Sequence, residues 1–213
     1  MTTAAARSLV VVSAGLAQPS STRLLADRIS AAVDRHLRDA GIEPTIEVIE
    51  LREHAQDLVN NLLTGFASPR LQAAIDRIVA ADGLIAVTPI FSASYSGLFK
   101  LFFDVIDRDG LAETPTLIAA SGGTARHSLA IEHAIRPLFA YLNAAVVATG
   151  VYAAAEDWGQ AGLTADGSLV ERIDRAAGEL ATAIAARPRR TPSDPFASPT
   201  PFEQILASDA APD

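Results

Sequence analysis

The chain has 213 residues, the length of one domain, and hydrophobic residues make up 49% of it, so a sizeable core can form. Its 17 basic and 25 acidic residues give a net charge of −8, which argues against a general nucleic-acid-binding protein, because such proteins carry a basic surface. It has no cysteine, which excludes disulfides, thiolate catalysis and cysteine-ligated metal centres.

The N-terminal residues lead directly into the apolar run Leu9–Val12. This run is too short for the core of a signal peptide and has the character of a strand. No apolar run in the chain approaches the roughly 20 residues that span a bilayer. We therefore expect a cytoplasmic protein that contacts no membrane.

From residue 9 to residue 186, apolar runs typical of strands alternate with amphipathic stretches typical of helices. The predicted strands cover residues 9–14, 45–51, 83–88, 115–121 and 144–150. The predicted helices cover residues 22–39, 56–63, 69–81, 96–106, 125–142 and 168–186. This alternation indicates a parallel sheet covered on both faces, and right-handed crossovers leave few arrangements for it. We predict an α/β fold with a doubly wound, five-stranded parallel sheet in the order 2-1-3-4-5.

The predicted helix 96–106 is apolar almost all round, whereas a helix on one face of a sheet should expose a polar side. We interpret this as burial by a second subunit. The alternative is a helix buried deeply within a monomer.

We predict one folded domain over residues 1–187. Residues 188–213 contain six of the chain's 12 prolines, together with Ser, Thr and Asp, and this composition sustains neither a helix nor a strand ladder. We expect a flexible tail. The alternative is an arm that docks on a neighbour through its apolar side chains, which are Phe196, Phe202, Ile205 and Leu206.

A sheet of this order binds its ligand beyond the carboxyl ends of strands 1 and 3, so the loops after residues 14, 88 and 121 form the candidate site. In the first loop, Ser20, Ser21 and Thr22 stand where a helix begins, and Arg23 lies in its first turn. The free N–H groups and partial positive charge of a helix N-terminus suit a phosphate monoester, and hydroxyls add donors. We predict a phosphate site here, with an ordinary helix cap as the alternative.

Two common nucleotide signatures are missing from the chain. No Gly-x-Gly-x-x-Gly follows the first strand, which disfavours a standard dinucleotide-binding fold. The P-loop pattern is absent as well, and Lys100 is the only lysine.

The second loop begins at Pro89, which fixes the chain as it leaves the strand. Small and aromatic residues follow, so a flat heterocycle could lie against Phe91 or Tyr95; the alternative is a tight turn whose aromatic residues fill the core. The third loop contains Gly122 and Gly123, which allow the backbone to approach a ligand closely. A simple turn explains these glycines equally well.

Together, the loops resemble those of the NADPH-dependent FMN reductase family, which has a flavodoxin-like fold, and in particular the reductase components of two-component flavin monooxygenases. The resemblance covers about residues 8–155. Its most specific motif is Thr88-Pro89-Ile90-Phe91-Ser92-Ala93-Ser94-Tyr95-Ser96-Gly97-Leu98-Phe99-Lys100. Supporting motifs are Ser20-Ser21-Thr22-Arg23, Gly122-Gly123, His127 and Arg136-Pro137-Leu138. Phe91 stands where the family usually has Tyr, and the first loop lacks the commoner Gly-Ser-x-Arg pattern.

The resemblance assigns all three loops to FMN. The phosphate would bind the first loop, at Ser13, Ser20, Ser21, Thr22 and Arg23. The isoalloxazine ring would lie along the second loop, at Pro89, Ile90, Phe91 and Ser94. The edge of the ring would meet the third loop, at Ser121, Gly122 and Gly123. Because the flavin itself accepts the hydride, we expect no catalytic side chain. We also expect no metal site, because His127 and His133 lie six residues apart, off any single helical face, and His36 and His54 are far away in sequence.

The resemblance also implies hydride transfer from NADPH to FMN, a monooxygenase partner that takes up reduced FMN, and a homodimer or homotetramer with its sites near subunit boundaries. Arg126 and His127 could neutralise a phosphate of the nicotinamide substrate, or they are an ordinary surface arginine and a capping histidine. Two other functions stay open: a quinone or azo-compound reductase with tightly bound FMN, and a flavodoxin-like electron carrier.

Overall fold

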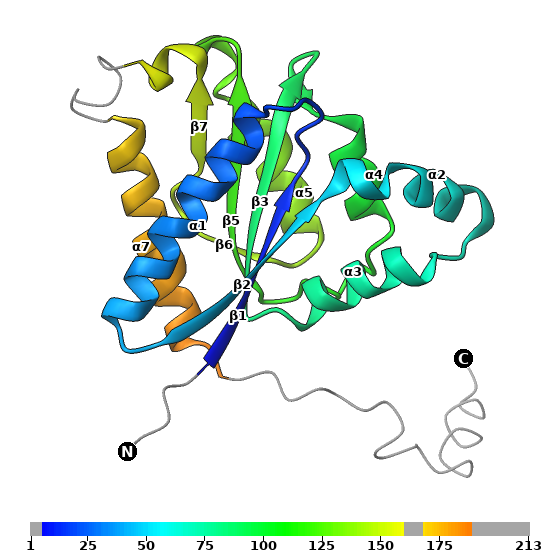
Figure 1. The fold of residues 1–213 in the computed structure, drawn as a ribbon, viewed down its shortest axis with the longest axis horizontal. Helices are drawn as coiled ribbons and strands as arrows, with labels where there is room; N and C mark the ends of the chain where they lie inside the picture. Colours follow the sequence, from blue (N-terminus) through cyan, green and yellow to red (C-terminus); the bar gives the residue numbers. More distant parts are fainter. Residues whose placement is uncertain (1–5, 160–167, 189–213) are drawn as a thin grey trace, which may run out of the picture.

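The computed structural model describes residues 6–159 and 168–188, and Figure 1 shows their arrangement. The strands are β1 (Ala6–Ser13), β2 (Glu43–Glu50), β3 (Gly83–Phe91), β4 (Ser94–Tyr95), β5 (Pro115–Gly122), β6 (Ala145–Val146) and β7 (Val151–Ala154). The α-helices are α1 (Ser21–Asp39), α2 (Ala55–Thr64), α3 (Pro69–Ala80), α4 (Gly97–Asp104), α5 (Arg136–Tyr141) and α7 (Leu169–Ala186). Shorter helices are the 3₁₀ turns η1 (Leu51–His54), η2 (Ala125–His127) and η4 (Ala155–Trp158) and the π-helical segment η3 (Ile131–Ile135). The predicted tail, residues 188–213, lies outside the described residues after its first position.

The main sheet has the order β2-β1-β3-β5-β6, and these strands are parallel. This confirms the predicted doubly wound α/β fold and its strand order, with β5 and β6 as the fourth and fifth predicted strands. The predicted count of five is only partly right, because the described residues form seven strands. β4 makes an antiparallel hairpin with β3, and β7 pairs with the end of β5.

The predicted strand 144–150 is wrong in its centre, where the chain leaves the sheet. β6 pairs with the start of β5 and β7 with its end. Between them, the N–H and hydroxyl of Thr149 donate to Glu179 of α7 at 2.8 and 2.6 Å, and Arg136 donates to the carbonyl oxygen of Ala148 at 3.0 Å. These side-chain bonds replace ladder bonds, so one apolar run becomes two short strands.

The predicted helix 125–142 is also wrong, because the stretch is divided among η2, η3 and α5. Pro137 has no N–H to donate to the carbonyl oxygen four residues earlier, so the α-helical ladder is interrupted there. The N–H of Arg136 donates to the carbonyl oxygen of Ile131, five residues back, which is the spacing of a π-helix.

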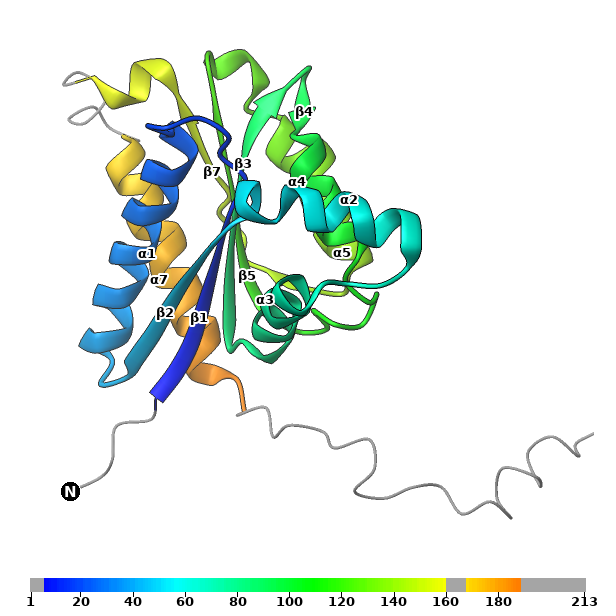
Figure 2. The same cartoon turned by 45° about the vertical axis from the view of Figure 1, so that its right-hand side comes forward.

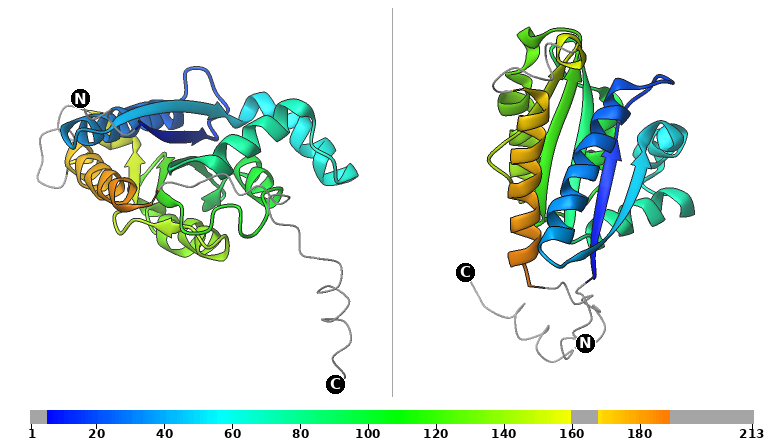
Figure 3. Two further views of the ribbon diagram at one scale, coloured as in Figure 1. Left: turned by 90° about the horizontal axis from the view of Figure 1, so that it is seen from below. Right: turned by 60° about the vertical axis from the view of Figure 1, so that its left-hand side comes forward.

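Helices cover both faces of the sheet (Figures 1 and 3). α1 and α7 lie side by side on one face, and α3, α4 and α5 lie on the other. Within β1, Leu9 and Val11 face α1 and α7, whereas Val10 and Val12 face the opposite layer. Burial on both faces explains why the strands read as continuous apolar runs. Among the described residues, no helix combines the length and apolar character needed to cross a membrane.

The apolar helix predicted at 96–106 is α4, and the chain itself buries its phenylalanines. These are Phe99, Phe102 and Phe103. Phe103 packs against Phe139 of α5, with their ring centroids 4.8 Å apart. Burial within one chain, the alternative to burial by a second subunit, therefore accounts for these three side chains. Leu98 and Leu101 of the same helix are only half-buried.

Candidate functional site

The three loops predicted to bind a ligand meet at the carboxyl edge of the sheet, where β1, β3 and β5 end (Figure 2). Pro89 of β3 is the register partner of Ser121 of β5. The hydroxyl of Ser121 in turn shares a 2.8 Å hydrogen bond with the hydroxyl of Thr22, in the first turn of α1. One residue of the third loop therefore connects the first loop with the second.

The first loop turns tightly into α1. A Cβ atom added at Gly15 would lie 2.1 Å from Oγ of Ser20 and 3.3 Å from Cβ of Thr22, so a side chain at this position would displace the Ser20 hydroxyl. Ser20 caps the helix, since its Oγ accepts a hydrogen bond from the N–H of Arg23 at 3.2 Å. The N–H groups of Ser21 and Thr22 belong to the first turn, where the helix itself offers no acceptor. The expected cap is present, and first-turn donors remain beside it.

The hydroxyl residues predicted for the site fall into two groups. Ser13, Thr22 and Ser121 are 1%, 2% and 4% exposed, so their hydroxyls lie beneath the surface of the edge. Ser20 is half-buried and Ser21 is exposed. A ligand at the first loop can therefore reach the hydroxyls of Ser20 and Ser21 directly.

Arg23 is held by two carboxylates. Its Nε donates to Asp27 at 2.7 Å and its Nη1 to Glu50, the last residue of β2, and the hydrogen bond with Asp27 raises the pKa of Arg23. Glu50 also pairs with Arg52 at 2.6 Å, and Nη1 of Arg52 lies 3.5 Å from the carbonyl oxygen of Ala17 in the first loop. Glu50 and Arg52 were not predicted from the sequence, although their place at the end of the edge strand was an available signal.

The second loop is the hairpin between β3 and β4. Its central residues, Ser92 and Ala93, have φ angles of 49° and 68°, the left-handed values that a type I′ turn needs at both positions. Phe91 is 49% exposed, whereas Tyr95 packs against Phe99 with ring centroids 6.0 Å apart. The tight turn is present, but Tyr95 alone of its two aromatic residues contributes to the core. The other predicted ring residues are Pro89, which is buried, and Ile90 and Ser94, which are half-buried.

Tyr152 of β7 anchors the third loop, a role that the sequence did not predict. Tyr152 is 5% exposed, and its hydroxyl donates to the carbonyl oxygen of Thr124 at 2.8 Å. Burial raises the pKa of Tyr152, which keeps the donating proton in place. A Cβ atom at Gly122 would lie 2.0 Å from this hydroxyl, whereas one at Gly123 would meet nothing within 4 Å. Packing therefore requires glycine at 122, and Gly123 leaves the surface open.

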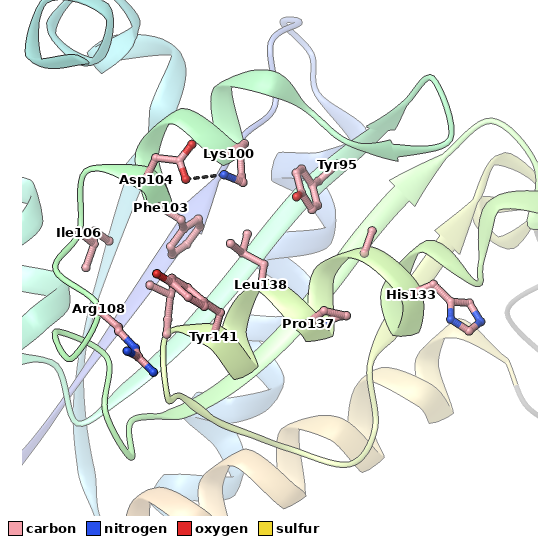
Figure 4. Close-up of a pocket in the computed structure, with 12 residues that line it drawn as sticks. Tyr95, Lys100, Phe103, Asp104, Ile106, Arg108, His133, Pro137, Leu138 and Tyr141 are labelled. Carbon is pink, nitrogen blue, oxygen red and sulfur yellow. Dashed lines mark hydrogen bonds and ion pairs between the residues drawn. The ribbon is translucent and has the colours of Figure 1, made fainter. Parts of the chain in front are cut away.

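A separate groove of about 680 Å³ lies between α4 and the segment formed by η3 and α5 (Figure 4). Lys100 and Asp104 form an ion pair on its α4 side, and the guanidinium carbon of Arg108 lies 5.4 Å from the ring centroid of Tyr141. Tyr95 is the residue of the β3–β4 hairpin that borders the groove. None of the residues predicted to bind FMN lines it, so the groove is distinct from the carboxyl-edge site.

Comparison with known proteins gives a consistent result. The family model for NADPH-dependent FMN reductase matches residues 8–159. A relative from Pseudomonas aeruginosa named FMN reductase (NADPH) is 39% identical over 150 residues, which cover 70% of this chain and 78% of the relative. The NADH-dependent FMN reductase SfnF of Pseudomonas fluorescens is 37% identical over 169 residues, 79% of this chain and 87% of the relative. The solved structure of an oxidoreductase from Corynebacterium diphtheriae is 46% identical with a TM-score of 0.82, and the match covers 85% of this chain and 98% of that one.

Proposed function

The chain belongs to the NADPH-dependent FMN reductase family, and we propose that it transfers hydride from NAD(P)H to FMN at the carboxyl edge of its sheet. FMN, when bound, supplies the hydride acceptor, and the protein binds and orients the two nucleotides. The observation that carries this placement is the contact between the loops, through the pairing of Pro89 with Ser121 and the hydrogen bond of Ser121 with Thr22. Family membership favours this activity over a quinone or azo reductase and over an electron carrier.

We infer that the first loop binds the phosphate of FMN. The N–H groups of Ser21 and Thr22 and the hydroxyls of Ser20 and Ser21 are the available donors, and the 19 residues of α1 add the partial positive charge of a helix N-terminus. Arg23 adds positive charge from the next position, although its guanidinium also binds two carboxylates. The buried hydroxyls of Ser13 and Thr22 lie under the donors that the ligand meets.

We infer that the isoalloxazine ring lies between the second and third loops. Residues of the second loop would form one wall: Pro89, Ile90, Phe91 and Ser94. Residues of the third loop would meet the edge of the ring: Ser121, Gly122 and Gly123. The exposed ring of Phe91 offers apolar contact area, and the open backbone at Gly123 offers a donor for a ring carbonyl. We propose no catalytic side chain, because hydride transfer requires the protein to orient the two nucleotides but not to donate or accept a proton.

Steady-state oxidation of NADPH with FMN, FAD or riboflavin as the varied acceptor tests this function. If the first loop binds the phosphate, the KM for riboflavin should exceed that for FMN by about tenfold or more, since one charge-assisted hydrogen bond contributes about 1.5–3 kcal/mol. Equal KM values for FMN and riboflavin would contradict the phosphate site. No oxidation of NADPH or NADH with any flavin would contradict the reductase activity itself.

We further propose a homodimer or homotetramer that forms through α4 and the adjoining groove. Tyr141 at the groove is exposed, and Leu98 and Leu101 of α4 are half-buried, so apolar area remains available there. Light scattering during size-exclusion chromatography should give two or four times the monomer mass, and Tyr141→Asp should lower it. A monomeric wild-type protein would contradict this assembly.

We also propose that the enzyme acts in the cytoplasm and supplies reduced FMN to a monooxygenase, as the resemblance to two-component systems implies. Product formation by such a monooxygenase, in a mixture with this protein, NADPH and FMN, tests the supply of reduced flavin. A monooxygenase that stays inactive in that mixture, but is active with chemically reduced FMN, would contradict it.

A further inference from the structure

We propose that Arg126, in the third loop, binds the 2′-phosphate of NADPH and thereby makes the enzyme discriminate NADPH from NADH. This rests on the proposed function, because it assigns a residue to the nicotinamide substrate of the same site. The positive charges near the carboxyl edge are few, and most of them are already bound.

Three of the arginines at this edge form ion pairs with carboxylates. Arg23 and Arg52 share Glu50, the last residue of β2. Arg172, in the first turn of α7, binds Asp157 at 2.6 Å. A guanidinium that already binds a carboxylate would have to give up that bond, at least in part, to bind a phosphate. These arginines are therefore poor candidates for recognising an additional phosphate.

Arg126 is different. Its side chain is exposed, and it has no acidic partner among residues 6–159 and 168–188. Arg28, the other arginine near this edge without a carboxylate in that part of the chain, stacks over Trp158 with its guanidinium carbon 4.9 Å from the ring centroid. Exposed His127 follows Arg126 directly and adds a second nitrogen group. Of the guanidinium groups that the described residues place at this edge, that of Arg126 is the one with neither a carboxylate nor an aromatic partner.

The backbone around Arg126 is anchored on both sides. Before it, the carbonyl oxygen of Thr124 accepts the 2.8 Å hydrogen bond from Tyr152. After it, the N–H of Ser128 donates to the carbonyl oxygen of Ala125 at 3.0 Å, which closes the short helix η2. Arg126 therefore extends from a fixed turn, three residues after Gly123, which lies at the proposed edge of the flavin ring. When the nicotinamide ring of NADPH lies against the flavin, the adenosine half of the same nucleotide should lie near the loops around this edge.

The positive charge of Arg126 would favour NADPH over NADH. NADPH differs from NADH by a 2′-phosphate, which carries about −1.5 to −2 charges near neutral pH, as other phosphate monoesters do. The protein has a net charge of −8, so the additional phosphate is repelled unless a local cation offsets it. A guanidinium presents paired N–H donors that match a phosphate, and an unpaired one loses no existing bond when it does so.

The test compares NADPH and NADH in the wild-type protein and in the variants Arg126→Ala and Arg126→Lys. Arg126→Ala should raise the KM for NADPH by about 10- to 100-fold, with little change in kcat or in the KM for NADH. Arg126→Lys should restore part of the affinity, since lysine keeps the charge but loses the paired donors. Arg175→Ala is the matched control, because Arg175 is an exposed arginine on α7 and its loss changes the net charge equally.

A second readout does not depend on turnover. Adenosine 2′,5′-bisphosphate should bind the wild-type protein about tenfold or more tightly than adenosine 5′-monophosphate, and Arg126→Ala should remove that difference. The proposal is overturned if Arg126→Ala leaves the NADPH KM unchanged, if it raises both nicotinamide KM values equally, or if the wild-type protein does not prefer NADPH. It is also overturned if the variant weakens FMN but not riboflavin, which would place the anion on the flavin. If the wild-type protein binds the bisphosphate selectively but reduces no flavin, the proposed function is contradicted and the phosphate site at Arg126 is still supported.

Discussion

The two edges of the central sheet use polar residues in opposite ways. At the amino edge, Arg7 donates to Asp82 at 2.9 Å and to the carbonyl oxygen of Arg187 at 2.6 Å, and the N–H of Ser8 donates to Asp82 at 2.8 Å. These groups bind each other and are mostly buried. At the carboxyl edge, Ser21 and the third loop stay exposed to solvent. One edge pairs its polar groups within the fold, and the other leaves some of them exposed, where a ligand could reach them.

The carboxyl edge is not loosely built, however. Exposed or half-buried residues of the loops are held by buried ones. Ser20 packs next to Gly15, and the carbonyl oxygen of Thr124 accepts a hydrogen bond from the hydroxyl of Tyr152. If the edge binds FMN as proposed, binding should therefore also depend on Gly15 and Tyr152, which are buried beneath its surface. The contrast between the edges predicts that a variant at the amino edge loses stability alone, whereas a variant in the three loops of the carboxyl edge weakens FMN binding.

The largest effect is expected at the amino edge, for Asp82→Asn. It should lower the free energy of unfolding by about 3 kcal/mol, because the side chain of Arg7, 9% exposed, would keep a charge without its carboxylate. Urea denaturation measures this loss, and kcat/KM at 25 °C should not change. The control is Asp174→Asn, whose ion pair with Arg35 is exposed and should be worth less than about 1 kcal/mol. Similar losses in the two variants would break the contrast.

Tyr152→Phe should combine both kinds of effect. Removing the hydroxyl leaves the carbonyl oxygen of Thr124 without its donor, which should lower the free energy of unfolding by about 1 kcal/mol. The freed loop should raise the KM for FMN by about three- to tenfold, measured by NADPH oxidation. Tyr141→Phe serves as the control, since it removes a hydroxyl in the separate groove but keeps the ring that the proposed subunit interface uses. An unchanged KM in Tyr152→Phe would mean that the hydroxyl serves stability alone.

Ser20→Ala and Ser21→Ala separate helix capping from phosphate binding. Ser20→Ala should lower the free energy of unfolding by about 1 kcal/mol, because Ser20 caps α1, whereas Ser21→Ala should leave it unchanged. Both should raise the KM for FMN by about threefold or more without affecting that for riboflavin. If neither variant changes FMN binding, the two hydroxyls belong to the helix and not to the ligand site.

The smallest effect concerns His54, which is buried at the carboxyl edge, with no hydrogen-bond partner for its Nδ1 among the described residues. Burial lowers the pKa of His54 below its ordinary value of 6.5. The unfolded chain then binds the proton more readily, so this contribution to stability is complete above pH 6.5. It is lost as the pH falls through the lower folded pKa, by about 1.4 kcal/mol per pKa unit of difference.

Urea denaturation at pH 7.5 and pH 5.0 measures this dependence. His54→Gln should lose less stability over that interval than the wild-type protein does. His133→Gln, which replaces an exposed histidine, should behave like the wild-type protein. An unchanged pH dependence in His54→Gln would show that the buried ring does not titrate as its surroundings indicate.

Much of the fold follows from local pattern. The sequences of β1, β3 and β5 are apolar runs, which predicts strands of a parallel sheet. The sequences of α1, α3 and α7 have clear caps and helical periodicity, which predicts the helices that cover it. The predicted strand 144–150 and helix 125–142 were wrong for a nonlocal and a local reason respectively. Glu179 draws Thr149 out of the ladder from 30 residues away. Pro137 breaks the helix from within, and its effect could have been foreseen.

The candidate site divides in the same way. Glycines, hydroxyls and a proline at three strand ends predict where it lies, because these residue types have strong local preferences. Which of its groups a ligand can reach depends on contacts between distant segments: Thr22 is buried against Ser121, 99 residues away, and Arg23 is bound by Glu50. Such a contact requires no particular residue pattern around either partner, so the local sequence does not predict it. It forms because the fold places the N-terminus of α1 beside the end of β5, where the hydroxyls of Thr22 and Ser121 lie 2.8 Å apart.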